Sequence, residues 1–267
     1  MPKKKKIQRK SIDKTKTIPK PKASIEELQE SRNGGQIALR GYSYQFLYSC
    51  YLMLSCKDEN AVFNLEGIED IDKIVSTSDE QKTMHIQLKY SENKQDASFM
   101  KSVLKNFLEA YLLDKNRTFK LVYDFSVAKG HLSKLVNNIL DSEELQYWKD
   151  TVDEIKNENP QWNWHQLDLD DFISKISYEN IKKAVLAERV EVALIENYDI
   201  TTDNIKLVAN SIKMFCFEKM ETRSAVSLND LKHQIELVKF DISKGAENPA
   251  HGWIEKVNFN ELTDQKS

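Results

Sequence analysis

The sequence contains few cysteines, and their arrangement supports neither a disulfide framework nor a zinc site. Three cysteines occur in 267 residues, and no two of them form a Cys-x-x-Cys pair. Disulfide-rich domains and zinc modules need several cysteines at defined spacings. We therefore expect free thiols and a reducing compartment, which predicts a cytoplasmic location. The three are Cys50, Cys56 and Cys216.

Long apolar runs are also missing. No stretch approaches the roughly 20 apolar residues of a membrane-spanning helix. The lysines at residues 3–6 are not followed by the apolar segment that a secretory signal requires. We expect no membrane association and no export.

Most of the chain lacks an excess of positive charge. The net charge is -3, but residues 1–22 hold ten Lys or Arg and one Asp, which leaves 29 basic and 41 acidic residues in the remainder. Local patches rather than totals attract phosphate, so an acidic body does not exclude nucleic acid as a partner. Residues 1–33 have almost no apolar periodicity and are predicted to form a disordered basic tail. This tail either adds salt-sensitive affinity for nucleic acid or is simply solvated.

Helical and strand periodicities then follow one another in an order typical of an α/β domain. Residues 37–56 carry apolar and aromatic side chains at spacings of three and four, which predicts a largely buried helix. Residues 61–90 contain three short strand-like runs, residues 96–115 a second amphipathic helix, and residues 119–125 a fourth strand. This order predicts a small mixed sheet flanked by helices.

The second half of the chain has mainly helical periodicity. Helices are predicted over residues 131–155, 172–197, 205–220 and 228–240. We therefore divide the chain into the tail, an α/β core at residues 34–128, and a helical extension at residues 129–267. The extension is expected to complete the domain and to offer a partner or oligomer interface.

Two features of this half have competing interpretations. The acidic run DLDD at residues 168–171 is either a second metal site or the N-terminal cap of a helix. Trp162 and Trp164 either anchor a partner chain or pack against the domain itself.

Polar side chains gather on one face of the last predicted strand in residues 61–90. Successive side chains of a strand point to opposite faces. His85, Gln87 and Lys89 therefore share one face, while the apolar residues between them share the other. One face can belong to the core and the other to a site.

Acidic residues precede this strand. Asp70 and Asp72 share a face if the middle run is regular, and Glu66 closes the first run. Carboxylate and amide oxygens suit Mg²⁺ or Mn²⁺, and a lysine ammonium beside such an ion supports phosphodiester hydrolysis. The pattern therefore indicates a metal-dependent nuclease.

The same residues resemble a known signature. An acidic residue on one strand followed by (D/E/Q)xK on the next is similar to the motif of the PD-(D/E)xK nuclease superfamily. More narrowly, GGQIALRGYSYQF at residues 34–46, LEGIEDID at 65–72 and IQLKY at 86–90 resemble the double-stranded-DNA endonuclease domain of CBASS nuclease-SAVED effectors. The resemblance is most specific from residue 34 to residue 90. It implies a restriction-endonuclease-like core.

The resemblance also implies roles for single residues. Lys89 is the implied catalytic lysine, and Gln87 takes the place of the usual acid, which removes one charge from the metal shell. The doubled EDID leaves open whether Asp70 or Asp72 is essential. The implied ligands of Mg²⁺ or Mn²⁺ are Glu66, Asp70, Asp72 and Gln87, and the implied catalytic group is Lys89, Asp70, Asp72 and Gln87.

Three further residues are predicted to contact DNA. Arg40 lies at a glycine-flanked helix start, where a guanidinium can hold a phosphate. Gln45 occupies the place where many members of the superfamily have a glutamate on the first helix. His85 is on the face of the site, and simple exposure is its alternative.

The predicted function is metal-dependent cleavage of double-stranded DNA by the effector subunit of a bacterial antiphage system. The resemblance implies activation by a separate sensor or ATPase subunit. A homo-oligomer is expected on activation, because cutting both strands usually needs two active sites. The alternatives are a catalytically idle scaffold that binds a partner, and a nuclease for RNA or branched DNA.

Overall fold

The computed structural model describes residues 34–247 except residue 79. The predicted basic tail, residues 1–33, lies outside the described residues. The chain divides into two compact units, residues 1–38 and residues 39–267. Of the first unit, only the opening residues of helix α2 (Gly34–Leu54) are described. The sheet and the site residues belong to the second unit.

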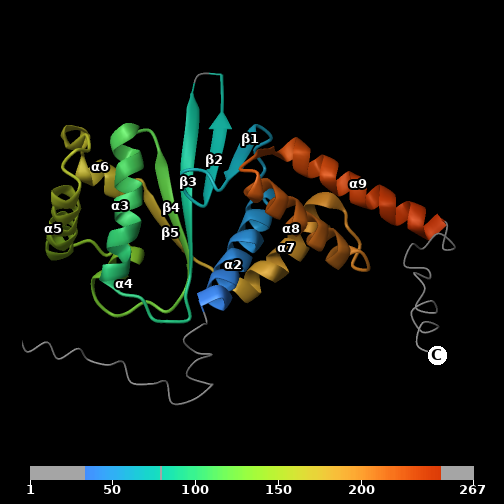
Figure 1. Ribbon diagram of the computed structural model, residues 1–267, viewed down its shortest axis with the longest axis horizontal. Coiled ribbons are helices and arrows are strands. Elements are labelled where there is room, and N and C mark those ends of the chain that lie inside the picture. The colour runs from blue at the N-terminus through green and yellow to red at the C-terminus, as the bar shows by residue number, and fades with distance from the viewer. Residues whose placement is uncertain (1–33, 79, 248–267) are drawn as a thin grey trace, which may run out of the picture. The chain divides into compact units, whose positions relative to one another are not determined.

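A mixed sheet of six strands lies at the centre of this unit (Figure 1). The strand order is β5-β4-β3-β2-β1-β6; β3, β4 and β5 run parallel, and the remaining neighbours pair antiparallel. The fold is the predicted mixed sheet flanked by helices. The strands are β1 (Ala61–Leu65), β2 (Ile71–Ser76), β3 (Gln81–Tyr90), β4 (Thr118–Asp124), β5 (Ile176–Asn180) and β6 (Ala225–Ser227).

Helices cover both faces of the sheet (Figure 1). One face packs against α2, α7 (Lys183–Tyr198), α8 (Ile205–Glu221) and α9 (Leu228–Glu247). The other face packs against α3 (Ala97–Leu113), α4 (His131–Val136), α5 (Ser142–Glu158) and α6 (Leu169–Ser174). Within the described residues, no helix combines the length and apolarity needed to cross a bilayer. The cytoplasmic location stays a prediction.

Strand β3 lies between these two apolar layers, and its alternation decides which side chains meet each layer. Ile86 and Leu88 belong to the core that contains α2. His85 lies on the opposite face, where its ring stacks on Phe119 of the core beneath α3. Because Gln87 and Lys89 share the parity of His85, the polar face of β3 is the face that α3 covers.

The strand β5 contradicts one expectation. Residues 172–197 were predicted as a single helix, but Ile176–Asn180 form a strand between α6 and α7. These residues pair with β4, and sheet hydrogen bonding prevails over a helical spacing of apolar residues. The short strand β6 was also missed. Both strands follow residue 129, so the second half of the chain contributes to the sheet; the division at residue 128 stays a prediction.

The other helices are close to their expected positions. The predicted helices at 96–115, 205–220 and 228–240 correspond to α3, α8 and α9. The predicted helix at 131–155 is interrupted between α4 and α5, where Asn138 has a positive φ of 57°. A residue in this conformation ends a helix.

The two features of the second half serve local structure. Asp168 caps α6 by accepting a hydrogen bond from the Asp171 amide at 3.1 Å. The DLDD run therefore acts as a helix cap. The rings of Trp162 and Trp164 stack with centroids 5.6 Å apart and pack against the core beneath α3. The tryptophans are thus packing residues of the domain.

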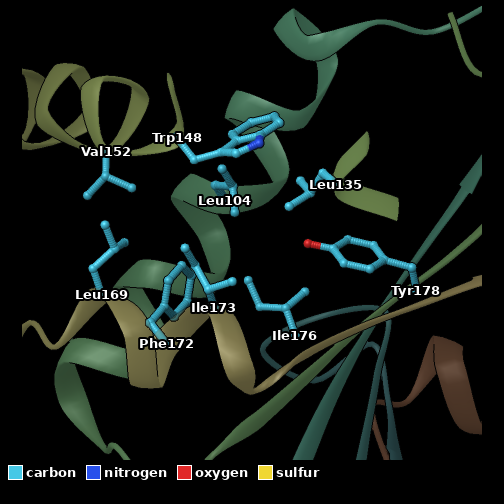
Figure 2. A pocket seen from close by; sticks show the side chains of 9 residues that line it. All are labelled: Leu104, Leu135, Trp148, Val152, Leu169, Phe172, Ile173, Ile176 and Tyr178. Carbon is cyan, nitrogen blue, oxygen red and sulfur yellow. The ribbon is translucent and has the colours of Figure 1, made fainter. Parts of the chain in front are cut away.

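The helical layer around α5 and α6 encloses a cavity that is too small for an organic ligand. Its volume is about 10 Å³, and its lining is apolar except for Trp148 and Tyr178 (Figure 2). Trp148 Nε1 and Tyr178 Oη are buried and have no hydrogen-bond partner among the described residues. Such a volume holds at most about one water molecule, so this cavity is a packing defect in the core rather than a substrate site.

Candidate active site

The turn that joins β1 to β2 carries the predicted acids and lies beside the end of β3. Leu65 pairs with Ile71 across the hairpin, so residues 66–70 form the turn itself. Ile71 in turn pairs with Ile86 of β3. Since β2 and β3 are antiparallel, the residues before Ile71 lie next to the residues after Ile86. The acids of the turn therefore lie beside the part of β3 that carries Gln87 and Lys89.

Glu66 opens the turn in the left-handed backbone conformation, with φ at 59°. Its backbone amide donates to the Asp70 carbonyl oxygen at 3.0 Å, which closes the turn. Its Oε1 accepts a hydrogen bond from Gln45 Nε2 of α2 at 2.5 Å. Gln45 is buried, so it orients Glu66. This burial does not fit the direct contact with DNA that was predicted for Gln45.

Asp70 ends the turn and is fixed against β3. Its Oδ2 accepts a hydrogen bond from the Leu88 backbone amide at 2.6 Å. Burial raises the pKa of the Asp70 carboxyl; the Leu88 hydrogen bond and the Lys89 ammonium oppose this effect, and the Glu66 charge adds to it. Glu66 and Lys89 thus lie close enough to Asp70 for their charges to act on it.

Glu69 is a further acid of the turn, and sequence reasoning counted it among the acids there but assigned it no individual role. Its side chain is buried, and burial together with the Asp70 charge raises its pKa to about 7. The Lys89 ammonium and a hydrogen bond with Asn106 of α3 act in the opposite direction. The one sequence signal for Glu69 is its position among the other acids.

Asp72 is held inside the turn. Its Oδ2 accepts a hydrogen bond from the Ile68 amide at 2.8 Å, and its Oδ1 lies 2.6 Å from His85 Nδ1. The Glu69 amide donates to the same Oδ1 at 3.4 Å. Its two oxygens are therefore occupied by protein donors, whereas Asp70 lies beside Lys89.

His85 is fully buried and does not reach the surface of the site. Its ring stacks on Phe119 with centroids 5.8 Å apart, and its Nε2 lies 2.7 Å from Arg117 Nη1. Both ring nitrogens are thereby engaged by protein groups. The predicted contact between His85 and DNA does not fit this arrangement.

Gln87 supplies an amide oxygen without a partner. Its side chain is only 4% exposed, and its Oε1 forms no hydrogen bond with the described residues. An unpaired buried acceptor costs about 1–3 kcal/mol. A bound cation would satisfy it.

The donors of the site suit an oxygen-ligated ion rather than zinc. The described part of the chain contains no group of three or more His, Cys, Asp or Glu placed to hold a metal by themselves. The oxygen donors carried here by the turn and by β3 are the carboxylates of Glu66 and Asp70 and the amide oxygen of Gln87. Mg²⁺ is commonly bound by one or two carboxylates and retains several waters, so this set fits it.

Arg40 lies within α2 rather than at its start, because the helix begins at Gly34. Its guanidinium pairs with Glu92, which is exposed. Lys183, the first residue of α7, donates from Nζ to the Arg40 carbonyl oxygen at 3.2 Å. The same ammonium lies 5.3 Å from the centre of the Tyr90 ring. Two cations are thus adjacent to the end of β3.

Comparison with known proteins gives one family match. The family model described as "Cap4, dsDNA endonuclease domain" matches residues 33–213. No curated protein matches the chain by sequence.

Two solved structures from Acinetobacter baumannii have a similar fold. The Cap4 SAVED/CARF-domain containing receptor with the cyclic trinucleotide 3'3'3'-cAAA has a TM-score of 0.51 and 15% identity, covering 74% of this chain and 44% of the receptor. A second structure of the Cap4 SAVED/CARF-domain containing receptor has a TM-score of 0.52 and 14% identity, covering 74% of this chain and 46% of the receptor. The chain therefore spans less than half of the length of these receptors.

Proposed function

The chain belongs to the family of Cap4 double-stranded-DNA endonuclease domains, and from this premise we propose that it hydrolyses double-stranded DNA with bound Mg²⁺ or Mn²⁺. The observation that carries the proposal is the position of Asp70. Its carboxylate is held by the backbone amide of Leu88, which lies in β3 between Lys89 and Gln87, whose amide oxygen has no partner among the described residues. Carboxylate, amide and ammonium groups are thus carried by one end of β3 and the turn beside it.

Glu66, Asp70 and Gln87 would hold the ion. A bound divalent ion would supply an activated water and would stabilise negative charge on the scissile phosphate. Asp72 was also a candidate ligand, but its oxygens accept hydrogen bonds from the turn. Of the two aspartates, we assign the metal-binding role to Asp70.

The residues around the ion have separate tasks. Gln45 orients the Glu66 carboxylate from α2, and the Leu88 amide orients Asp70 from β3. The Lys89 ammonium favours the ionised form of Asp70, because it lowers the pKa of that carboxyl. The same positive charge would stabilise the charge that develops on the phosphate during cleavage.

The biological setting is proposed by analogy with the Cap4 receptors. Those proteins carry a SAVED/CARF domain, and one was solved with a cyclic trinucleotide. We propose that this chain is the effector of a CBASS-type antiphage system and is activated by a separate sensor or ATPase subunit. Activation would bring two copies together, because each strand of a duplex needs its own hydrolytic site.

Cleavage of supercoiled plasmid DNA tests the proposed function. The purified chain, alone and with its candidate sensor, is incubated with Mg²⁺ or with EDTA. Cutting that requires the metal and is lost in Lys89→Ala supports the assignment. Lys82→Ala is the matched control, because it removes an exposed lysine from the start of the same strand.

Other outcomes identify the alternatives. Cutting by Lys89→Ala at the wild-type rate would overturn the assignment of the site. Binding of a partner without cleavage under any condition would indicate an idle scaffold. Competition that favours RNA or branched DNA over linear duplex would change the substrate.

A further inference from the structure

The turn at residues 66–70 is braced from inside by the side chain of Asp72. The Asp72 carboxylate accepts hydrogen bonds from the backbone amides of Ile68 and Glu69, at 2.8 and 3.4 Å. These amides lie between Glu66 and Asp70, the two residues assigned to the metal. Asp72 therefore controls the backbone that presents both carboxylates.

Asp72 is itself held by a buried chain of side chains. His85 Nδ1 lies 2.6 Å from Asp72 Oδ1, and His85 Nε2 lies 2.7 Å from Arg117 Nη1. His85 is completely buried, whereas the side chain of Arg117 is 24% exposed. The chain thus runs from the loop between α3 and β4, across β3, to the turn.

The chemistry of the partners fixes the proton on His85. An arginine guanidinium can only donate hydrogen bonds, so His85 Nε2 must accept. The imidazole is then neutral with its proton on Nδ1, where it donates to Asp72. Each contact has one donor and one acceptor, which gives the chain a single direction from Arg117 to Asp72.

The Asp72 carboxylate leaves no space for a side chain at Gly67. A Cβ atom built on Gly67 would lie 2.3 Å from Asp72 Oδ2, far inside contact distance. Any larger residue at position 67 must displace the carboxylate or the turn. The turn and the Asp72 side chain are therefore fitted to each other.

We propose that Asp72, His85 and Arg117 form a positioning chain that holds the Glu66 and Asp70 carboxylates in place for the metal. The proposal rests on the proposed function for the meaning of these carboxylates. In this role none of the three residues would touch the ion or the DNA. Their role is to fix the ligands, as outer partners do in other metal sites.

Two measurements without DNA test the positioning chain of Asp72, His85 and Arg117. The first is Mn²⁺ binding to the whole polypeptide, measured by isothermal titration calorimetry. The second is backbone hydrogen exchange of the peptide that contains residues 66–70 in the metal-free protein. Because neither needs cleavage, a wild-type protein that binds Mn²⁺ but does not cut DNA, either alone or with its sensor, would overturn the proposed function and leave this test intact.

The variants act at different points of the chain. Arg117→Gln breaks its half-buried outer end, Gly67→Ala displaces the Asp72 carboxylate, and Asp72→Asn removes the charge but keeps the shape. Lys115→Ala, which removes a neighbouring cation outside the chain, is the matched control. Circular dichroism confirms folding, and Arg117→Lys, which retains a cationic donor, should recover part of the loss.

The proposal predicts that Arg117→Gln and Gly67→Ala weaken Mn²⁺ binding by about 10–100-fold and speed exchange in the turn. Lys115→Ala should change neither. Loss of Mn²⁺ binding in Asp72→Asn alone, with wild-type behaviour of the other variants, would make Asp72 a ligand and overturn the proposal. Unchanged binding and exchange in all variants would also overturn it.

Discussion

Asp70 accepts a 2.6 Å hydrogen bond from the backbone amide of Leu88, the residue immediately before Lys89 in β3. The strand therefore fixes the distance between this carboxylate and the lysine without a direct bond between the two side chains. A backbone donor is retained under any side-chain substitution in β3 except proline. The pair can thus be tested by changing Asp70 alone.

Asp70→Asn should abolish most of the cleavage without unfolding the protein. The amide keeps an oxygen for the Leu88 hydrogen bond but loses the charge that would bind the metal. We expect a fall of about 100-fold or more in the rate of plasmid cleavage. Glu59→Gln, at an exposed acid paired with Lys232, is the control. Full activity of Asp70→Asn would return the metal-binding role to Asp72.

Gln45→Met should raise the Mg²⁺ concentration needed for half-maximal cleavage, with a smaller effect on the maximum cleavage rate. Methionine has a similar volume but cannot donate the 2.5 Å hydrogen bond to Glu66. A carboxylate that loses its outer partner binds metal about 10–100-fold less tightly. Initial cleavage rates measured over a range of Mg²⁺ concentrations should therefore show a higher half-saturating concentration. An unchanged Mg²⁺ dependence would show that Glu66 needs no support from α2.

The contributions of sequence and tertiary structure can be separated within the site. Strand parity correctly placed Gln87 and Lys89 on one face of β3, because the alternation of side chains is a local property. Parity alone could not separate Asp70 from Asp72. That difference arises from the tight turn, in which Glu66 is left-handed and the Asp72 carboxylate folds back onto backbone amides.

Long-range contacts explain the remaining errors. His85 has a polar side chain on a strand, and the sequence does not show that Arg117, 32 residues away, provides a buried partner. The strand β5 has the same origin, since its pairing with β4 depends on residues more than 50 positions apart. The periodicity of α3 and β3 was sufficient because their burial repeats over many residues.

Glu69→Gln should stabilise the metal-free protein at pH 8 and have little effect at pH 5. Burial raises the pKa of Glu69 from 4.5 to about 7, so the folded state favours the protonated carboxyl. The contribution of the protonated Glu69 carboxyl to the stability of the fold is complete below about pH 4.5 and is lost as the pH rises through 7. The neutral amide avoids the loss, by on the order of 1–3 kcal/mol at pH 8.

Urea denaturation at the two pH values measures this difference. Glu109→Gln, at an exposed acid of α3, is the control and should show no dependence on pH. An equal effect of Glu69→Gln at pH 5 and pH 8 would show that the carboxyl titrates normally in the fold.

Arg40→Ala should weaken DNA binding, and Glu92→Gln should strengthen it. Glu92 forms an ion pair with Arg40, so its neutralisation frees the guanidinium for a phosphate. Loss of one phosphate contact should reduce the slope of log K against log salt concentration, where K is the binding constant, by about one. Fluorescence anisotropy of a labelled duplex in the Lys89→Ala background measures binding without cleavage. Lys206→Ala, an exposed lysine of α8, is the control. Equal affinity of all variants would exclude Arg40 from the DNA surface.

Tyr178→Phe should leave the protein as stable as before or up to about 1 kcal/mol more stable. The Tyr178 hydroxyl is buried without a partner among the described residues and lines the cavity shown in Figure 2. Removing an unsatisfied hydroxyl removes its desolvation cost. Tyr111→Phe is the matched control, because the Tyr111 hydroxyl donates to Asp171 at 2.8 Å.

Thermal denaturation of the two variants should give opposite results. Tyr111→Phe should lose about 1 kcal/mol, since it removes a satisfied hydrogen bond and leaves Asp171 with one donor fewer. Destabilisation of Tyr178→Phe by a similar amount would contradict the prediction. It would mean that the hydroxyl has a partner in solution, and the cavity of about 10 Å³ has room for a single buried water in that role.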